Sequence, residues 1–525
     1  MTNHQEISEA YWDSFEVSDS DIEILYNHLL EIESPQAPEE LISAIVQQRI
    51  QAIKTAQQKE QEKKGDVYKP AGSYAAGQKL TFPSMEWKSG KVQSIHDGFN
   101  PEFPGLKVID VLFEQGETHS FASNLLNHAL NHVAEQSVTQ QLLDQQCVIQ
   151  QYGHQLQQKL DENLSHNKEL IRIAGKWFPK ALLVDINSGY LNLAEAVLEE
   201  MQGGPLPTTK LMEQIEFKTD TNQQLTEFSL NHALQEDGRF DEVGPTGEVL
   251  WFLNAFEPEE VRHLPVFLKS QVFDYDHQET NPLLVQFEGS VFDELEEWEK
   301  PSDPQQEVIL SLIFPHWRAG TLPLSHSLEQ FFPTAYESPR VKFNFHDIDN
   351  KVKFPGWVVR EHRYVSGLKD WYSQCDLMPG SLIYLRKGEE PGEIIIQRKK
   401  SKQSREWMRT ALIGSDLGIV FGMLKQNVVA SFNERMAIAV PDPEPIDQLW
   451  LKESAKSGEI NEVIEKVIFE LMKLNPQIHA QELYAAVNVI RRCPPGCVIH
   501  FLLHSPRVKQ LGDLYFQVID SEGVG

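Results

Sequence analysis

Glycine and proline residues divide this chain into short segments, and successive segments change between helical and strand-like patterns of apolar residues. The clearest break is Gly203-Gly204-Pro205-Leu206-Pro207, where no helix can continue. At about 150 residues per domain, a chain of 525 residues with so many changes of pattern predicts several small domains. With 41% hydrophobic and 10% aromatic residues it can build real cores, which excludes a disordered or fibrous chain.

The formal net charge of −30 is distributed unevenly. Residues 1–50 contain eleven acidic side chains and one basic one, whereas residues 340–410 contain fifteen basic and nine acidic side chains. A second acidic cluster, residues 287–299, precedes the basic segment. The total charge disfavours a protein that coats nucleic acid, but it leaves room for a local contact through the basic segment. Acidic segments are most often solvated surfaces and less often contacts to a basic partner.

The composition also bears on the compartment. No run of 18 apolar residues occurs and the first residues are polar and acidic, so we expect neither a membrane-spanning helix nor a secretory signal. Four cysteines do not make a disulfide framework. These features predict a cytoplasmic protein without a membrane partner.

The patterns predict an α+β multi-domain fold that contains a small SH3-like β-barrel, two winged helix-turn-helix modules and a basic, pseudobarrel-like β domain. A Gln-rich helix repeats Leu142, Ile149 and Leu156 every seven residues, which allows self-association through a coiled coil. The predicted boundaries are an acidic helical region at 1–70, the barrel at 71–125, the Gln-rich helix at 126–172, the first winged helix at 173–256, an acidic connector at 257–304, the basic β domain at 305–450 and the C-terminal winged helix at 451–525.

Residues 192–253 predict three short helices followed by two strands, the order of a winged helix-turn-helix. Within them, Pro205-Leu-Pro-Thr208, Phe228-Ser-Leu-Asn-His-Ala-Leu234, Asp237-Gly-Arg-Phe240 and Trp251-Phe-Leu253 resemble the HARE-type winged helix. That family occurs in the bacterial RNA polymerase delta subunit, in some restriction enzymes and in chromatin-linked proteins. The resemblance implies a DNA-associated or polymerase-associated module without catalysis.

One departure from a DNA-binding module stands out. The would-be recognition helix carries Glu227 and Glu236, with Asp237 beside it, and has no Lys or Arg. Such a helix is poorly suited to phosphates. We therefore expect this copy to contact protein or to serve as a structural wing.

Residues 308–400 are rich in predicted strands, with turns at 349–350, 378–380 and 391–392. The order Phe331-Phe-Pro333, Trp357-Val-Val359 and a Pro-Gly turn before a strand resembles the DNA-binding pseudobarrel of plant transcription factors and of certain restriction-enzyme effector domains. This resemblance spans about 80 residues. It implies sequence reading through loops in the major groove.

Cations interleaved with aromatic residues suggest where DNA would bind, because cations neutralise phosphates and aromatic rings stack on bases. In the β domain Trp357 and Tyr364 lie beside such cations, and in the C-terminal module cations fall at a helix end and wing. The predicted DNA-binding residues are Arg360, Arg363, Lys369, Trp371, Arg398, Lys399, Lys400, Lys402, Arg405, Arg491, Arg492, Arg507 and Lys509.

We predict no catalytic residues, metal or cofactor. Cys493, Cys497, His500 and His504 are ligand types for zinc, but their spacing favours packing of one helix face. No phosphate-binding loop is present, and Glu393 lacks the Glu-x-Lys spacing of a restriction-type nuclease.

These observations predict a non-catalytic, DNA-associated regulatory protein that binds duplex DNA and acts with RNA polymerase or another basic protein. Two alternatives are a scaffold whose winged helices bind only proteins, and the specificity component of a restriction or defence system.

Overall fold

The protein has a mixed α+β structure with several separate sheets, as predicted. The computed structural model describes residues 10–64, 66–82, 85, 88–100, 103, 105–113, 116–126, 128, 131, 142–217, 222–271, 285–287, 289–295, 306–389, 392–414, 418–454 and 460–519, with the side chains of 57–64 and 400–403 excepted. Two compact units divide it: the first is Met1–Arg172, Lys176–Leu183 and Thr221–Leu225, and the second is Ile173–Gly175, Val184–Asp220 and Thr226–Gly525. Among these described residues, no helix is long and apolar enough to cross a bilayer.

Helices make up much of the first unit. They are α1 (Ala10–Asp13), α2 (Asp19–Ile32), α3 (Pro38–Lys64) and α5 (Gln145–Ser165), followed by the short strands β6 (Leu170–Ile173) and β7 (Lys176–Pro179). The Asp144 side chain caps α5 by accepting a hydrogen bond from Cys147 N at 2.9 Å. Helix α5 packs along α3, and its residues Leu156 and Leu160 are fully buried. Part of the apolar face that suggested self-association is therefore packed within the chain, and self-association of the helix stays a prediction.

A five-stranded sheet follows α3, where the sequence predicts a small barrel. Its strands are β1 (Asp66–Val67), β2 (Lys79–Phe82), β3 (Lys88–Asp97), β4 (Lys107–Phe113) and β5 (Thr118–Ser123), in the order β1-β2-β3-β4-β5. Alternate residues of β4 point into a core that also contains Tyr68 and Phe82. The backbone after β5 returns to the start of the sheet, because Leu125 N donates to Pro70 O at 2.8 Å and Asn124 N to Gly72 O at 3.1 Å.

The second unit begins with three helices and a small sheet. The elements are α6 (Ser188–Glu200), β8 (Leu206–Pro207), α7 (Thr208–Gln214), α8 (Gln223–Glu236), β9 (Phe240–Glu242) and β10 (Leu250–Leu253), with the sheet order β8-β10-β9. Three buried polar side chains meet in its core: Trp251 Nε1 donates to Asn231 Oδ1 at 2.9 Å and to Thr208 Oγ1 at 3.1 Å. All three come from segments that carry the resemblance described above.

The β9–β10 hairpin of this first module packs against the β domain of the same unit. Phe252 meets Trp357 edge to face, with ring centroids 5.3 Å apart, and Lys342 N donates to Val243 O at 3.0 Å. Arg340 Nη1 of the β domain forms an ion pair with Asp241 and donates a hydrogen bond to Glu257 Oε2 at 3.0 Å. The hairpin is thus a structural contact within the chain.

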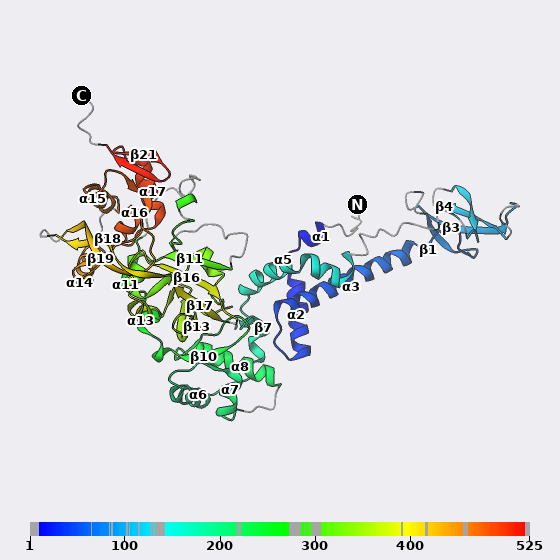
Figure 1. Ribbon diagram of the computed structural model, residues 1–525. Helices are drawn as coiled ribbons and strands as arrows, with labels where there is room; N and C mark the ends of the chain where they lie inside the picture. The colour runs from blue at the N-terminus through cyan, green and yellow to red at the C-terminus, as the bar shows by residue number, and fades with distance from the viewer. Residues whose placement is uncertain are drawn as a thin grey trace. The chain divides into compact units, whose positions relative to one another are not determined.

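The β domain is built on a seven-stranded sheet, visible in green and yellow in Figure 1. Its order is β11-β16-β17-β13-β14-β15-β12, and every neighbouring pair is antiparallel except β13 and β17. The elements are β11 (Glu307–Ser311), α11 (Phe314–Ala319), β12 (Thr321–Pro323), α12 (His326–Glu329), β13 (Arg340–Asp347), β14 (Val352–Val359), β15 (Tyr364–Ser366), α13 (Lys369–Gln374), β16 (Leu382–Lys387) and β17 (Glu393–Arg398).

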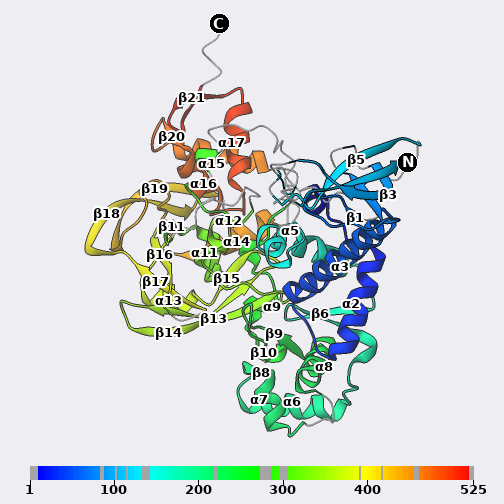
Figure 2. The ribbon, with the colours of Figure 1, turned by 90° about the vertical axis from the view of Figure 1, so that its right-hand side faces the viewer.

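After β17 the chain forms a long hairpin of β18 (Lys400–Ile413) and β19 (Ile419–Ala430). Its turn-side half shares a core with the C-terminal helices, through Ala411 and Phe421. Figures 1 and 2 both show the hairpin beside these helices. Gly380 allows close contact with the backbone of the segment after the hairpin, because a Cβ at that position would lie 2.3 Å from Ala437 Cα.

The C-terminal segment repeats the order of elements of the first module. It contains α14 (Pro443–Ser454), α15 (Ile460–Met472), β20 (Ile478–His479), α16 (Ala480–Val487), α17 (Pro495–His504), β21 (Val508–Gly512) and β22 (Tyr515–Val518). Its sheet order, β20-β22-β21, corresponds to β8-β10-β9. The sequence predicts one terminal strand over 511–519, whereas the structure has two strands joined by a turn at Asp513 and Leu514, both with positive φ.

Candidate nucleic-acid interface

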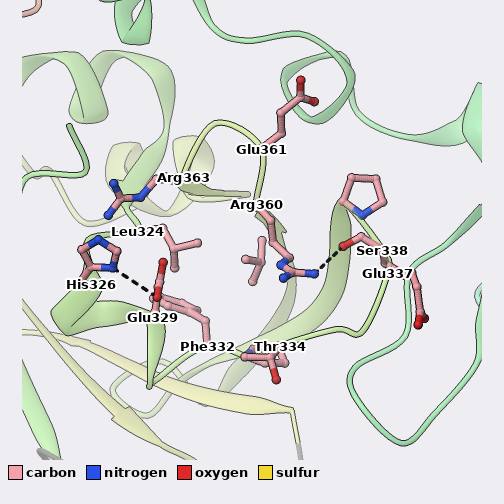
Figure 3. A pocket seen from close by; sticks show the side chains of 13 residues that line it. Leu324, His326, Glu329, Phe332, Thr334, Glu337, Ser338, Arg360, Glu361 and Arg363 are labelled. Atoms are coloured by element: carbon pink, nitrogen blue, oxygen red, sulfur yellow. Dashed lines mark hydrogen bonds and ion pairs between the residues drawn. The ribbon is translucent and has the colours of Figure 1, made fainter. Parts of the chain in front are cut away.

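Arg360 and Arg363 lie on the turn between β14 and β15, beside a groove of about 830 Å³ (Figure 3). Arg360 Nη1 donates to the carbonyl oxygens of Ala335 at 3.0 Å and Ser338 at 3.1 Å. The charged residues that line this groove are Arg360, Arg363, His326, Glu329, Glu337 and Glu361. Because three carboxylates accompany the two arginines, the groove offers a phosphate backbone no excess of positive charge.

The aromatic residues that were predicted to interleave with these cations are in the core. Trp371 is buried, and its Nε1 donates to Asp347 Oδ2 at 2.8 Å. Trp357 and Tyr364 are also buried, within the contact between the first module and the β domain. The prediction that Trp371 contacts DNA is therefore wrong: its indole faces the sheet, while its neighbour Lys369 is exposed at the start of α13.

The basic run at 398–405 spans the end of β17 and the start of β18. Arg398 is half-buried and donates to Cys375 O through Nη1. Lys399 and Arg405 are exposed. Lys400 and Lys402 belong to β18, but their side chains lie outside the described residues.

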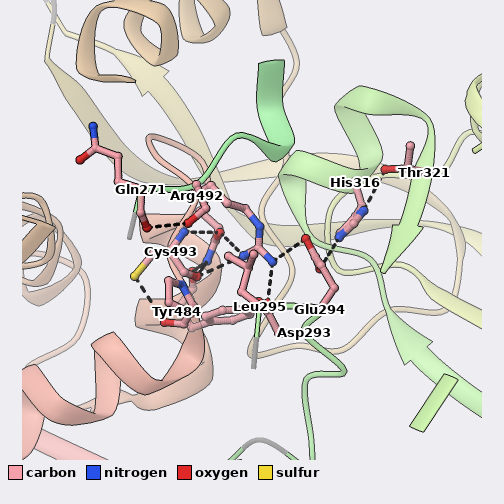
Figure 4. A network of polar contacts seen from close by, with 12 residues as sticks. Gln271, Asp293, Glu294, Leu295, His316, Thr321, Tyr484, Arg492 and Cys493 are labelled. Atoms are coloured by element: carbon pink, nitrogen blue, oxygen red, sulfur yellow. Dashed lines mark hydrogen bonds and ion pairs between the residues drawn. The ribbon is translucent and has the colours of Figure 1, made fainter. Parts of the chain in front are cut away.

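Arg491 and Arg492 were predicted as DNA contacts, and the structure corrects this. Arg492 is fully buried, with Nη2 2.6 Å from Asp293 Oδ1 and 2.9 Å from Glu294 Oε1 (Figure 4). Arg491 is buried as well and donates to Gln271 Oε1. Both residues are almost fully buried, in the segment between α16 and α17.

The same cluster explains part of the acidic segment at 287–299. Glu294 also lies 2.9 Å from His316 Nε2, and Asp293 accepts a hydrogen bond from the Tyr484 hydroxyl. Burial alone would favour the neutral carboxyl, but Arg492 and His316 hold the pKa of Glu294 well below its ordinary value. These two acidic residues therefore neutralise a cation of their own chain instead of forming a solvated surface.

Several exposed cations lie along the hairpin and the C-terminal sheet. On β18 and β19, Arg405 is paired with Asn427 and Trp407 with Lys425. Arg435 follows the hairpin and lies over the Tyr515 ring of β22, with Cζ 5.4 Å from the ring centroid. We call Arg405, Trp407, Lys425, Arg435, Tyr515 and Lys509 the basic face.

Lys509 belongs to this face because of the strand register. It is paired with Gln517, two residues after Tyr515, so all three side chains point to the same side of the sheet. Arg507 lies next to the face but pairs with Glu465 at 3.1 Å. Nearby His479 adds no positive charge at neutral pH, because burial and the neighbouring Arg435 lower its pKa to about 4.

Acidic residues limit the extent of the basic face. Arg409 lies on the same strand side as Arg405 and Trp407, but it pairs with Glu482 at 3.1 Å. Glu434 and Asp513 are exposed beside Arg435 and Tyr515 in the sequence. The face therefore consists of four exposed cations and two aromatic rings on the hairpin, the segment after it and the C-terminal sheet.

The sequence analysis missed Trp407, Lys425, Arg435 and Tyr515. Trp407 and Lys425 are 18 positions apart, and only the register of the hairpin brings them together. A usable signal existed: the turn-forming sequence Gly-Ser-Asp-Leu-Gly at 414–418 lies between the apolar runs Ala411-Leu-Ile413 and Ile419-Val-Phe421, which is typical of a hairpin.

The cysteine and histidine cluster does not form a metal site in the part of the chain that the structure describes. Cys493 and Cys497 are buried, whereas the His500 and His504 rings stack on each other with centroids 4.1 Å apart. Among the described residues, no group of three or more His, Cys, Asp or Glu side chains is placed to hold a metal ion.

Comparison of this chain with family models, with curated proteins and with solved structures finds no significant match.

Proposed function

We propose that the protein is a non-catalytic, DNA-associated regulatory protein that binds duplex DNA through the basic face. The observation that carries this proposal is the set of four exposed cations on adjoining elements: Arg405 and Lys425 on the hairpin, Arg435 after it against Tyr515, and Lys509 on the C-terminal sheet. Exposed cations in such a set attract a phosphate backbone, because binding releases the counterions that surround it.

The inferred fold types of the modules support this proposal. We infer that the two segments with the shared helix and strand order are winged helices, and that the seven-stranded sheet is a pseudobarrel. The closed ends of the five-stranded sheet support an SH3-like barrel for the first unit. Winged helices and pseudobarrels both hold DNA with loops and wings, and the proposed face combines a hairpin with a wing.

The first winged helix has a different proposed role. Its hairpin is packed against the β domain, and α8 carries glutamates and no Lys or Arg. We propose that this module contacts a protein through the exposed C-terminal end of α8 at Glu236, for which RNA polymerase or another basic partner remains our candidate. If this contact is the whole activity, the protein is a scaffold that binds no DNA.

The test replaces two cations of the face at once. We expect Arg405→Ala/Lys425→Ala to weaken binding of a dye-labelled 30-base-pair duplex by about tenfold or more in fluorescence anisotropy at 50 mM salt. A matched control, Lys210→Ala/Lys473→Ala, removes two exposed lysines elsewhere, each of which pairs with a neighbouring glutamate. Equal affinities of the two double variants would exclude the basic face as the DNA contact.

A further inference from the structure

The centre of the basic face is an exposed tryptophan that the duplex proposal does not use. Trp407 lies in the middle of β18, and 63% of its surface is open to solvent. Tryptophan is costly to expose, because its indole is the largest apolar ring among the side chains. Its surroundings indicate what would cover it.

The neighbours of Trp407 are cationic or polar. Lys425 is its cross-strand partner, with Nζ 5.3 Å from the ring centroid. Arg405, two residues earlier, points to the same side of the strand, and its Nε is 3.3 Å from Asn427 Oδ1. An apolar ring between two exposed cations is complementary to a nucleotide, which brings a flat base and a negative phosphate together.

The exposed position of the Trp407 ring on the hairpin determines which bases it can contact, unpaired or paired. In a duplex the base faces are covered by their neighbours, and the grooves present only base edges. An indole can stack only on a base whose face is free. Met423, 45% exposed and opposite Arg409, extends the apolar surface one step along the hairpin.

We propose that Trp407, with Lys425 and Arg405, is a stacking site for an unpaired base, so that the protein prefers single-stranded or locally opened DNA to closed duplex. This inference rests on the proposed function. In this proposal the Trp407 ring selects open DNA by stacking on an unpaired base. The four cations of the basic face contact the phosphate backbone of both single-stranded and duplex DNA.

The experiment compares two probes of equal length, a dye-labelled oligo-dT strand and a fully paired duplex. We expect Trp407→Ala to weaken oligo-dT binding by about 5- to 150-fold, the range for loss of one stacked base, and to leave duplex affinity within about twofold. Trp407→Phe keeps a ring and should retain most of the oligo-dT affinity. Leu412→Ala, a partly exposed apolar residue on the same strand, is the matched control and should change neither affinity.

The outcomes separate the two proposals. If duplex binds the wild type and Trp407→Ala loses affinity for neither probe or equally for both, the stacking site is excluded while the proposed function stands. If the wild type binds neither probe, the proposed function itself fails.

Discussion

At the residue scale, burial raises the pKa of two carboxyl groups in this chain. Glu242 at the end of β9 is largely withdrawn from water, and burial raises its pKa to about 8 from 4.5; the charge of Glu337 acts in the same direction. The pKa of Glu257 is raised to about 8 as well, by burial and by the charge of Asp241, although the charge of Arg340 opposes the shift. Both side chains lie where the first module meets the β domain.

A pH dependence of stability follows. Between about pH 4.5 and 8 the folded protein holds protons on these carboxyls that the unfolded chain has released, so its stability falls as the pH rises through this range. We expect Glu242→Gln, which cannot ionise, to flatten the fall in thermal unfolding temperature measured across it. The exposed Glu248→Gln is the control and should reproduce the wild-type slope. A Glu242→Gln variant with the wild-type slope would contradict the raised pKa.

Residue-scale features were also the hardest to predict from the sequence. Trp357 and Trp371 sit beside cations in the sequence, but neighbouring strand or helix positions face different sides, and both indoles point into the core. Arg492 looks like a surface cation because its partner Asp293 is 199 positions away. Local sequence carries no information on such a pairing.

At the element scale, the Arg492 cluster joins three parts of the second unit. Asp293 and Glu294 come from the segment before the β domain, His316 from α11 and Tyr484 from α16. Removing Arg492 would leave the buried carboxylates of Asp293 and Glu294 without their arginine partner, which lowers the free energy of unfolding by about 3–5 kcal/mol. The cluster therefore fixes this segment between the β domain and the C-terminal module.

Substitution of Arg492 should show this coupling. We expect Arg492→Met to lower the thermal transition of the second unit by about 4–7 °C, because an unfolding entropy of about 2.1 cal/mol/K per residue gives about 1.4 °C per kcal/mol for a unit of about 340 residues. The control is Arg507→Ala, whose pair with Glu465 is about half exposed and contributes about 0–1 kcal/mol. Similar shifts in the two variants would mean that the buried cluster contributes no more than a surface ion pair.

Elements were predicted better where apolar periodicity decides them. The β-branched and aromatic runs at 341–345, 382–386 and 393–397 predict strands, and these runs lie within β13, β16 and β17. The three short helices predicted within 192–253 correspond to α6, α7 and α8. The β18–β19 hairpin was missed because its first residues are polar and charged. Its stability comes from packing on the C-terminal helices, which no local pattern shows.

At the scale of the whole molecule, the charge of −30 and the basic face are compatible because the charges are distributed unevenly along the chain. Part of the acid neutralises cations within the fold, as at Arg492 and Arg340. The cations of the basic face remain exposed on adjoining elements. Association with DNA through so few contacts is expected to be local and strongly dependent on salt.

The salt dependence of duplex binding by the wild-type protein tests the central claim most directly. With Arg405, Lys425, Arg435 and Lys509 each neutralising one phosphate, affinity should fall about 150-fold between 50 and 200 mM salt, with a slope near −3.6 in log K against log salt. A slope near zero, or no binding at 50 mM salt, would contradict DNA binding through the basic face.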